Sequence, residues 1–182
     1  IATGIAERFP IEGQKSYGFV DPSGGSKDSF TLAIAHREAE RVIIDCIREV
    51  KPPLSPEGVV YDFSETLKRY GITRVVGDRY AGEWPREQFR KYGIFYDPSA
   101  EPKSFLYQNL LPVINSKRVL LLDNETLIKQ LISLERRTSR GGRDIIDHPP
   151  NGHDDVANAV AGVVSLLTTT ALHQSGRFVL RI

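Results

Sequence analysis

Two short apolar runs in this chain each end in an aspartate, and a long apolar run begins with two more. Asp21 closes the run Tyr-Gly-Phe-Val, Asp78 closes Val-Val-Gly, and Asp154 and Asp155 open a run rich in alanine and valine. Ends of neighbouring strands lie side by side, and a helix that crosses that edge can add a third carboxylate. Because gathered like charges repel unless a cation neutralises them, the pattern predicts a fold in which these elements meet at a site for hard divalent cations.

The rest of the pattern predicts three strands in hairpin order, followed by alternating helices and strands. The predicted strands cover 16–21, 30–36, 41–49, 72–77, 94–97 and 118–122. The predicted helices cover 55–70, 84–91, 103–115, 124–136 and 154–169. A polar hairpin or loop is expected over 137–147. This order predicts an α/β fold with a mixed sheet, antiparallel in its first three strands and parallel beyond, flanked by helices. It matches the ribonuclease H-like fold.

Length and composition are those of one ordinary globular domain. The chain has 182 residues and a net charge of +1, so any affinity for nucleic acid must come from local clusters of basic residues. We expect 1–14 to be a linker or N-terminal segment, 15–170 the folded domain and 171–182 a tail. No methionine is present, which suggests a piece of a larger protein. The single cysteine fits a reducing compartment, and no apolar stretch is long enough for a membrane span.

Each acidic position also has a structural explanation. Asp21 suits a turn, Asp78 suits a cap, and Asp154 or Asp155 suits the positive end of a helix dipole. Their conjunction favours a metal site, since one cap does not require two adjacent carboxylates. Ligation by oxygen alone selects Mg²⁺ or Mn²⁺. Two such ions, about 3.5–4 Å apart, can activate water and stabilise a leaving 3′-oxygen.

A basic segment precedes the acidic pair and is a candidate for binding the DNA backbone. Four arginines stand within eight residues: Arg136, Arg137, Arg140 and Arg143. Phosphates need charge rather than base readout, and two glycines allow the segment to turn. Lys103, at a helix start, is a further candidate for a phosphate contact, and His153 is a possible assisting residue beside the carboxylates. The alternatives are a solvated charged loop, a surface lysine and a loop histidine.

The chain lacks the sequence motifs of several other functional classes. The chain has no phosphate-binding P-loop, so it carries no such nucleotide site. It also has neither H-E-x-x-H nor a pair of C-x-x-C motifs, which makes zinc chemistry an unfavoured interpretation.

Three segments resemble the C-terminal nuclease domain of the large terminase subunit of tailed bacteriophages and prophages. They are Tyr17–Pro22, Val75–Asp78 and Asn151–Ala159, the last with Gly-His-Asp-Asp followed by alanine. The similarity extends over about residues 15–169, and the motifs occur in the family's order. The resemblance implies a ribonuclease H-like fold, akin to that of Holliday-junction resolvases.

The resemblance also implies an activity and roles for the acidic residues. The activity is metal-dependent endonucleolytic cutting of concatemeric viral DNA during genome packaging, with little sequence specificity. Asp21 corresponds to the bridging metal ligand and Asp78 to the second, while the third falls on Asp154 or Asp155. The family often carries another acidic residue near the position where this chain has Asn158.

The implied partners are double-stranded DNA, an N-terminal packaging ATPase domain of the same protein, the portal and the small terminase subunit. The implied location is the cytoplasm of the infected bacterial host. Three alternatives stay open: a resolvase or transposase of the same fold, a non-catalytic DNA-binding or docking module, and a phosphotransfer domain of the actin-like ATPases. A comparison of junction and linear DNA cleavage would identify a resolvase. A docking module would have no activity to lose, and Asp21→Asn would change only its stability. ATP binding by the chain would favour the phosphotransfer domain.

Overall fold

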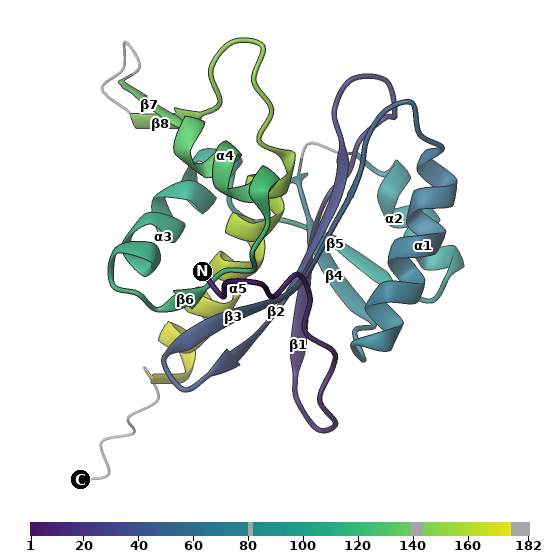
Figure 1. The fold of residues 1–182 in the computed structure, drawn as a ribbon. Coiled ribbons are helices and arrows are strands. Elements are labelled where there is room, and N and C mark those ends of the chain that lie inside the picture. The colour runs from purple at the N-terminus through teal and green to yellow at the C-terminus, as the bar shows by residue number, and fades with distance from the viewer. Residues whose placement is uncertain (80–81, 139–143, 176–182) are drawn as a thin grey trace, which may run out of the picture.

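The computed structural model describes residues 1–79, 82–138 and 144–175, which form a mixed sheet with helices on both faces (Figure 1). The strands are β1 (Ser16–Asp21), β2 (Phe30–Glu38), β3 (Arg41–Val50), β4 (Arg74–Gly77), β5 (Phe95–Pro98), β6 (Val119–Leu120), β7 (Glu135–Thr138) and β8 (Asp144–Asp147). The helices are α1 (Pro56–Arg69), α2 (Trp84–Lys91), α3 (Lys103–Asn115), α4 (Glu125–Ser133) and α5 (Asp155–Ser175).

The main sheet has the strand order β5-β4-β1-β2-β3-β6. β1, β2 and β3 form an antiparallel meander, whereas β4 runs parallel to β1, β5 parallel to β4 and β6 parallel to β3. β1 is therefore central, with an antiparallel neighbour on one side and a parallel neighbour on the other. The expected α/β architecture with its mixed sheet is confirmed.

Helices cover the two faces of the sheet unequally. α1 and α2 lie on one face, while α3, α4 and α5 lie on the other (Figure 1). α5 is buried against both the sheet and α3, so it is apolar around most of its circumference rather than along one stripe. Gly162 lets it approach β1: a Cβ there would lie 2.3 Å from Cγ of Phe19, too close for any side chain.

Most elements fall where the sequence predicts them, and the ends differ where tertiary pairing decides. The helix predicted over 124–136 ends at Ser133, because Glu135 and Arg136 pair with β8 instead. The expected hairpin after it is the antiparallel pair β7–β8. The last helix continues to Ser175, past the predicted end at 169, since neither glycine nor proline interrupts that stretch.

The N-terminal segment before β1 is tied to the domain through backbone hydrogen bonds. The Ala2 N–H donates to the carbonyl of Leu121 at 2.8 Å, and the Arg8 N–H donates to the carbonyl of Asp45 at 2.7 Å. Tyr70 donates its hydroxyl to the Arg8 carbonyl at 2.6 Å. Within the described residues, no helix has the length and apolar character needed to cross a membrane.

Candidate metal centre

The parallel pairing of β1 with β4 brings Asp21 and Asp78 together. Val20 is the register partner of Gly77, so the residue that follows each of them stands at the same edge of the sheet. The Asp78 N–H donates to the Val20 carbonyl at 3.1 Å, which ties the end of β4 to the end of β1. Tyr96 of the next strand donates its hydroxyl to the Asp78 carbonyl at 2.9 Å. Two strand ends thus place two carboxylates at one point.

The start of α5 supplies the other two carboxylates. The Asp154 carbonyl accepts the first helical bond, from the Asn158 N–H at 2.7 Å, and α5 begins at Asp155. β2 fixes this helix start: Thr31 donates its hydroxyl to the Asp155 carbonyl at 2.8 Å, and the Ser29 N–H donates to Asp155 Oδ2 at 3.2 Å. Both aspartates are buried, with 4% and 7% of their surface exposed. The positive end of the helix dipole favours charge at this position.

One cavity collects all four carboxylates. Its volume is about 290 Å³, and it is lined by Asp21, Pro22, Asp28, Asp78, Lys103, His148, His153, Asp154, Asp155 and Asn158. Three elements contribute the acidic groups: the ends of β1 and β4, and the start of α5. The structure therefore brings together the four acidic residues that the sequence singles out, although they are up to 134 positions apart (155 minus 21).

Burial makes the charged forms of two carboxyl groups costly. It raises the pKa of Asp21 well above its usual value; the Asn158 hydrogen bond opposes this rise, whereas the charges of Asp78, Asp155 and Asp154 add to it. Burial also raises the pKa of Asp155, partly offset by the Ser29 N–H. Among the described residues, no basic side chain lies within ion-pair distance of Asp21. A divalent cation would supply the missing positive charge.

Asn158 is a residue of this site whose role the sequence did not define. It is 1% exposed and lies one turn into α5, where its Nδ2 donates to Asp21 Oδ2 at 2.8 Å. Its Oδ1 is buried and accepts no hydrogen bond from any described residue. An unpaired buried carbonyl oxygen costs about 1–3 kcal/mol, so this atom is suited to face a cation.

Lys103 lies inside the acidic cluster rather than on an open surface. Its Nζ is 2.7 Å from Asp147 Oδ1 and 3.1 Å from Asp154 Oδ2. Burial disfavours its charge, but the hydrogen bond to Asp147 and the charge of Asp154 outweigh this and raise the pKa of Lys103. Tyr107, one turn along α3, donates its hydroxyl to Asp154 Oδ2 at 2.8 Å. α3 therefore holds the Asp154 carboxylate in place with one ammonium and one hydroxyl.

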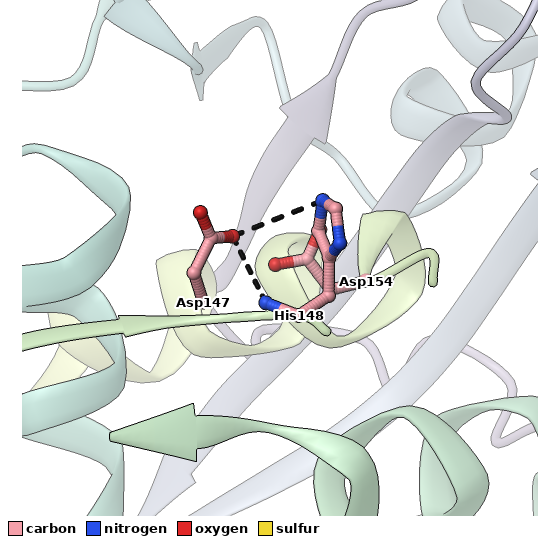
Figure 2. A group of neighbouring side chains, drawn as sticks. All are labelled: Asp147, His148 and Asp154. Carbon is pink, nitrogen blue, oxygen red and sulfur yellow. Dashed lines mark hydrogen bonds and ion pairs between the residues drawn. The ribbon is translucent and has the colours of Figure 1, made fainter. Parts of the chain in front are cut away.

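Asp147, His148 and Asp154 form a second group of converging ligands beside the first (Figure 2). One ligand atom from each lies within 4.8 Å of the others. Nδ1 of His148 donates to the Pro149 carbonyl at 2.8 Å, so in the neutral ring Nε2 carries the lone pair. Nε2 lies 3.8 Å from Asp147 Oδ1 and 3.9 Å from Asp154 Oδ1. This group can also hold a cation, and it shares Asp154 with the first.

The structure describes only some of the arginines that the sequence proposes for DNA binding. Arg136 and Arg137 are exposed on β7, where Arg137 pairs with Glu135 at 2.5 Å. Arg140 and Arg143 lie outside the described residues. His153 is exposed at the mouth of the cavity, with Nδ1 3.7 Å from Asp28 Oδ1 and 3.9 Å from Asp155 Oδ2.

Sequence reasoning missed several members of the cluster. Asp147, Tyr107 and His148 are not among the site residues that the sequence predicts. Asp147 and His148 lie four and five residues after Arg143, and Tyr107 lies four residues after Lys103, one turn along the same helix face. These spacings are the signal that could have identified them.

The strand order and its helices define a ribonuclease H-like domain, and comparison with solved structures narrows the fold further. The nuclease of the large terminase of thermophilic phage G20c superposes with a TM-score of 0.75 at 19% identity, covering 87% of this chain and 85% of that one. The nuclease domain of Thermus phage P74-26 gives 0.67 at 18% identity, covering 88% and 90%. The HK97 bacteriophage large terminase gives 0.69 at 14% identity, covering 89% of this chain and 41% of that one.

The chain thus has the fold of the phage large-terminase nuclease domain, as its motifs predict. The identities are low, so the likeness concerns fold. Further structures of the G20c nuclease contain bound magnesium, cobalt or zinc. Neither a family model nor a curated protein matches the chain by sequence.

Proposed function

We propose that this chain is a metal-dependent DNA endonuclease of the large-terminase kind. The observation that carries the proposal is the convergence of Asp21, Asp78, Asp154 and Asp155 in one cavity of a terminase-nuclease fold. Phosphodiester hydrolysis by this fold needs carboxylates that can hold divalent cations close together. The alternatives of a cap or a turn do not account for four carboxylates that share one cavity.

The donor set fits Mg²⁺ or Mn²⁺. Asp21, Asp78 and Asp155 offer carboxylate oxygens, and Asn158 adds a buried carbonyl oxygen without a partner. Asp154 is positioned to serve this site and the neighbouring Asp147–His148 group together, which suits a pair of ions. The bound metals of the G20c nuclease support this assignment.

Residues around the carboxylates orient the metal ligands and can accept a proton. When bound, the cations lower the pKa of water and stabilise the charge that develops on the leaving 3′-oxygen. Asn158 orients Asp21 through its hydrogen bond, while Tyr107 and Lys103 hold Asp154. His153 at the cavity mouth can take up the proton that the attacking water releases. The products would carry 5′-phosphate and 3′-hydroxyl ends.

The substrate and partners follow from the same assignment. The DNA would be concatemeric viral duplex, cut with little sequence preference in the cytoplasm of the infected bacterium. Arg136, Arg137, Arg140 and Arg143 would contact the phosphate backbone. The chain matches 41% of the HK97 large terminase, so we propose an attached N-terminal packaging ATPase domain, with the portal and the small terminase subunit as further partners.

Plasmid cleavage tests the proposal. The wild-type chain, Asp21→Asn and the control Asp62→Asn are incubated with supercoiled plasmid in Mn²⁺, in Mg²⁺ and in EDTA. Asp62 is an exposed aspartate on α1, on the other face of the sheet. We expect metal-dependent nicking and linearisation by the wild type and by the control, and neither by Asp21→Asn. Equal cleavage by Asp21→Asn would refute the assignment, and preferential cutting of four-way junctions would favour a resolvase.

A further inference from the structure

A lysine-lined groove adjoins the carboxylate cavity on the side of the β1–β2 loop. It has a volume of about 590 Å³, and Lys27, Lys51 and Lys129 contribute to its walls. These lysines come from three separate segments: the loop before β2, the chain just after β3, and α4. Three cations from distant parts of the sequence therefore share one surface.

The groove lies next to the carboxylate cavity. His153 lines both hollows, and Ser29, which also lines the groove, donates its backbone N–H to Asp155 Oδ2 at 3.2 Å. A polymer lying in the groove would therefore lie beside the carboxylates at the start of α5.

The three lysines of the groove form few ion pairs within the described part of the protein, and those that they form are weak. Among described residues, no acidic group lies within ion-pair distance of Lys27. Lys51 is 4.0 Å from Glu49, and Lys129 pairs with Glu125 while 71% of its side chain stays exposed. Such exposed pairs are worth about 0–1 kcal/mol each, so an incoming phosphate can displace them at little cost.

The acidic groups that face the groove do not cancel its charge. Glu49 is the acidic residue in its lining, and its Oε1 accepts a hydrogen bond from the Ser29 hydroxyl at 2.9 Å, so that carboxylate is turned toward the protein. Two glutamates, Glu49 in the lining and Glu125 beside Lys129, stand against three lysines and leave a net charge of +1. A local excess of positive charge favours contact with a phosphate backbone.

We propose that Lys27, Lys51 and Lys129 form a phosphate-binding track that holds the DNA backbone beside the catalytic cavity. This rests on the proposed nuclease function and adds a binding surface distinct from the arginines of the β7–β8 segment. The contacts are to backbone charge, so the track contributes affinity and register without base specificity.

Salt-dependent binding tests the track without requiring cleavage. A fluorescein-labelled duplex is titrated in EDTA at several salt concentrations with the wild-type chain and with the triple variant Lys27→Gln, Lys51→Gln, Lys129→Gln. The matched control changes Lys68, Lys91 and Lys117 to Gln; these exposed residues lie on α1, on α2 and just past the far end of α3. Both variants lose three positive charges.

The expected result is a weaker salt dependence of DNA binding in the groove variant alone. The logarithm of the binding constant falls linearly with the logarithm of the salt concentration. Each lost phosphate contact reduces the magnitude of this slope by about 0.9, so three reduce it by about 2.7. The fall in affinity between 50 and 200 mM salt would then shrink about 40-fold, while the control keeps the wild-type slope. An unchanged slope, an equal change in the control, or no salt-dependent binding by the wild type would overturn the proposal.

Failure of the groove and failure of the nuclease assignment are distinguishable. Wild-type cleavage together with normal binding by the groove variant would refute the track and leave the nuclease intact. Groove-dependent binding by a chain that cuts no DNA in any metal would support the track and favour a DNA-docking module.

Discussion

Replacement of Gly162 by alanine tests how closely α5 must approach β1 to assemble the site. The new Cβ would lie 2.3–2.4 Å from three ring atoms of Phe19, where ordinary contacts begin at about 3.4 Å. Phe19 is fully buried, so its ring has no solvent into which it can move. Overpacking of this kind costs about 1–3 kcal/mol. Alanine in a helix interior returns about 1 kcal/mol.

We therefore expect Gly162→Ala to lower the free energy of unfolding by up to about 2 kcal/mol, or Tm by up to about 8 °C. Because α5 must move away from β1, the hydrogen bond from Asn158 to Asp21 should lengthen, and the stabilisation by Mn²⁺ should fall as well. Differential scanning calorimetry with EDTA or with Mn²⁺ measures both effects.

Gly58→Ala is the matched control. Gly58 also lies in a helix, but its added Cβ would meet only Ser55 atoms at 3.6 Å, an ordinary contact. This variant should gain up to about 1 kcal/mol. If Gly162→Ala is as stable as the wild type and responds equally to Mn²⁺, then close packing of α5 on β1 does not set the site.

Three further predictions concern the carboxylates. In EDTA, protonated Asp21 should stabilise the fold below the usual pKa of an aspartate, about 3.9. This contribution to the free energy of unfolding should be lost as pH rises through the raised pKa of Asp21 in the folded chain. Urea titrations should show the dependence weakened in Asp21→Asn. Tyr107→Phe removes a donor from the buried Asp154 carboxylate and should cost about 1–3 kcal/mol in the same assay, and no loss would contradict the role of that hydroxyl. Asn158→Asp replaces a donor to Asp21 with another carboxylate, so it should lower Tm in EDTA and enlarge the rise on adding Mn²⁺; a higher Tm in EDTA would contradict the charge argument.

The sequence predicts the sheet and its acidic edge because both depend on local patterns. β1, α2 and α3 begin and end where their apolar spacing and turn residues predict. Asp21 is the last residue of β1 and Asp78 follows β4 directly, so a parallel pairing of the two strands is enough to place them together.

Other features depend on contacts that no local pattern carries. The helical spacing around Leu131 continues past Ser133, but pairing with β8 draws Glu135 into a strand. Lys103 sits at a helix start, as a phosphate-binding lysine would, yet its carboxylate partners come from β8 and the start of α5. The unpaired oxygen of Asn158 becomes visible only once α5 lies against β1.

Direct measurement of Mn²⁺ binding tests the central claim, that the converging carboxylates form a cation site. Isothermal titration calorimetry is applied to the wild-type chain, Asp21→Asn and Asp62→Asn at neutral pH. The account predicts Mn²⁺ binding by the wild type and by Asp62→Asn, with affinity at least about tenfold weaker in Asp21→Asn. Equal binding by Asp21→Asn, or no binding by the folded wild type, would contradict it.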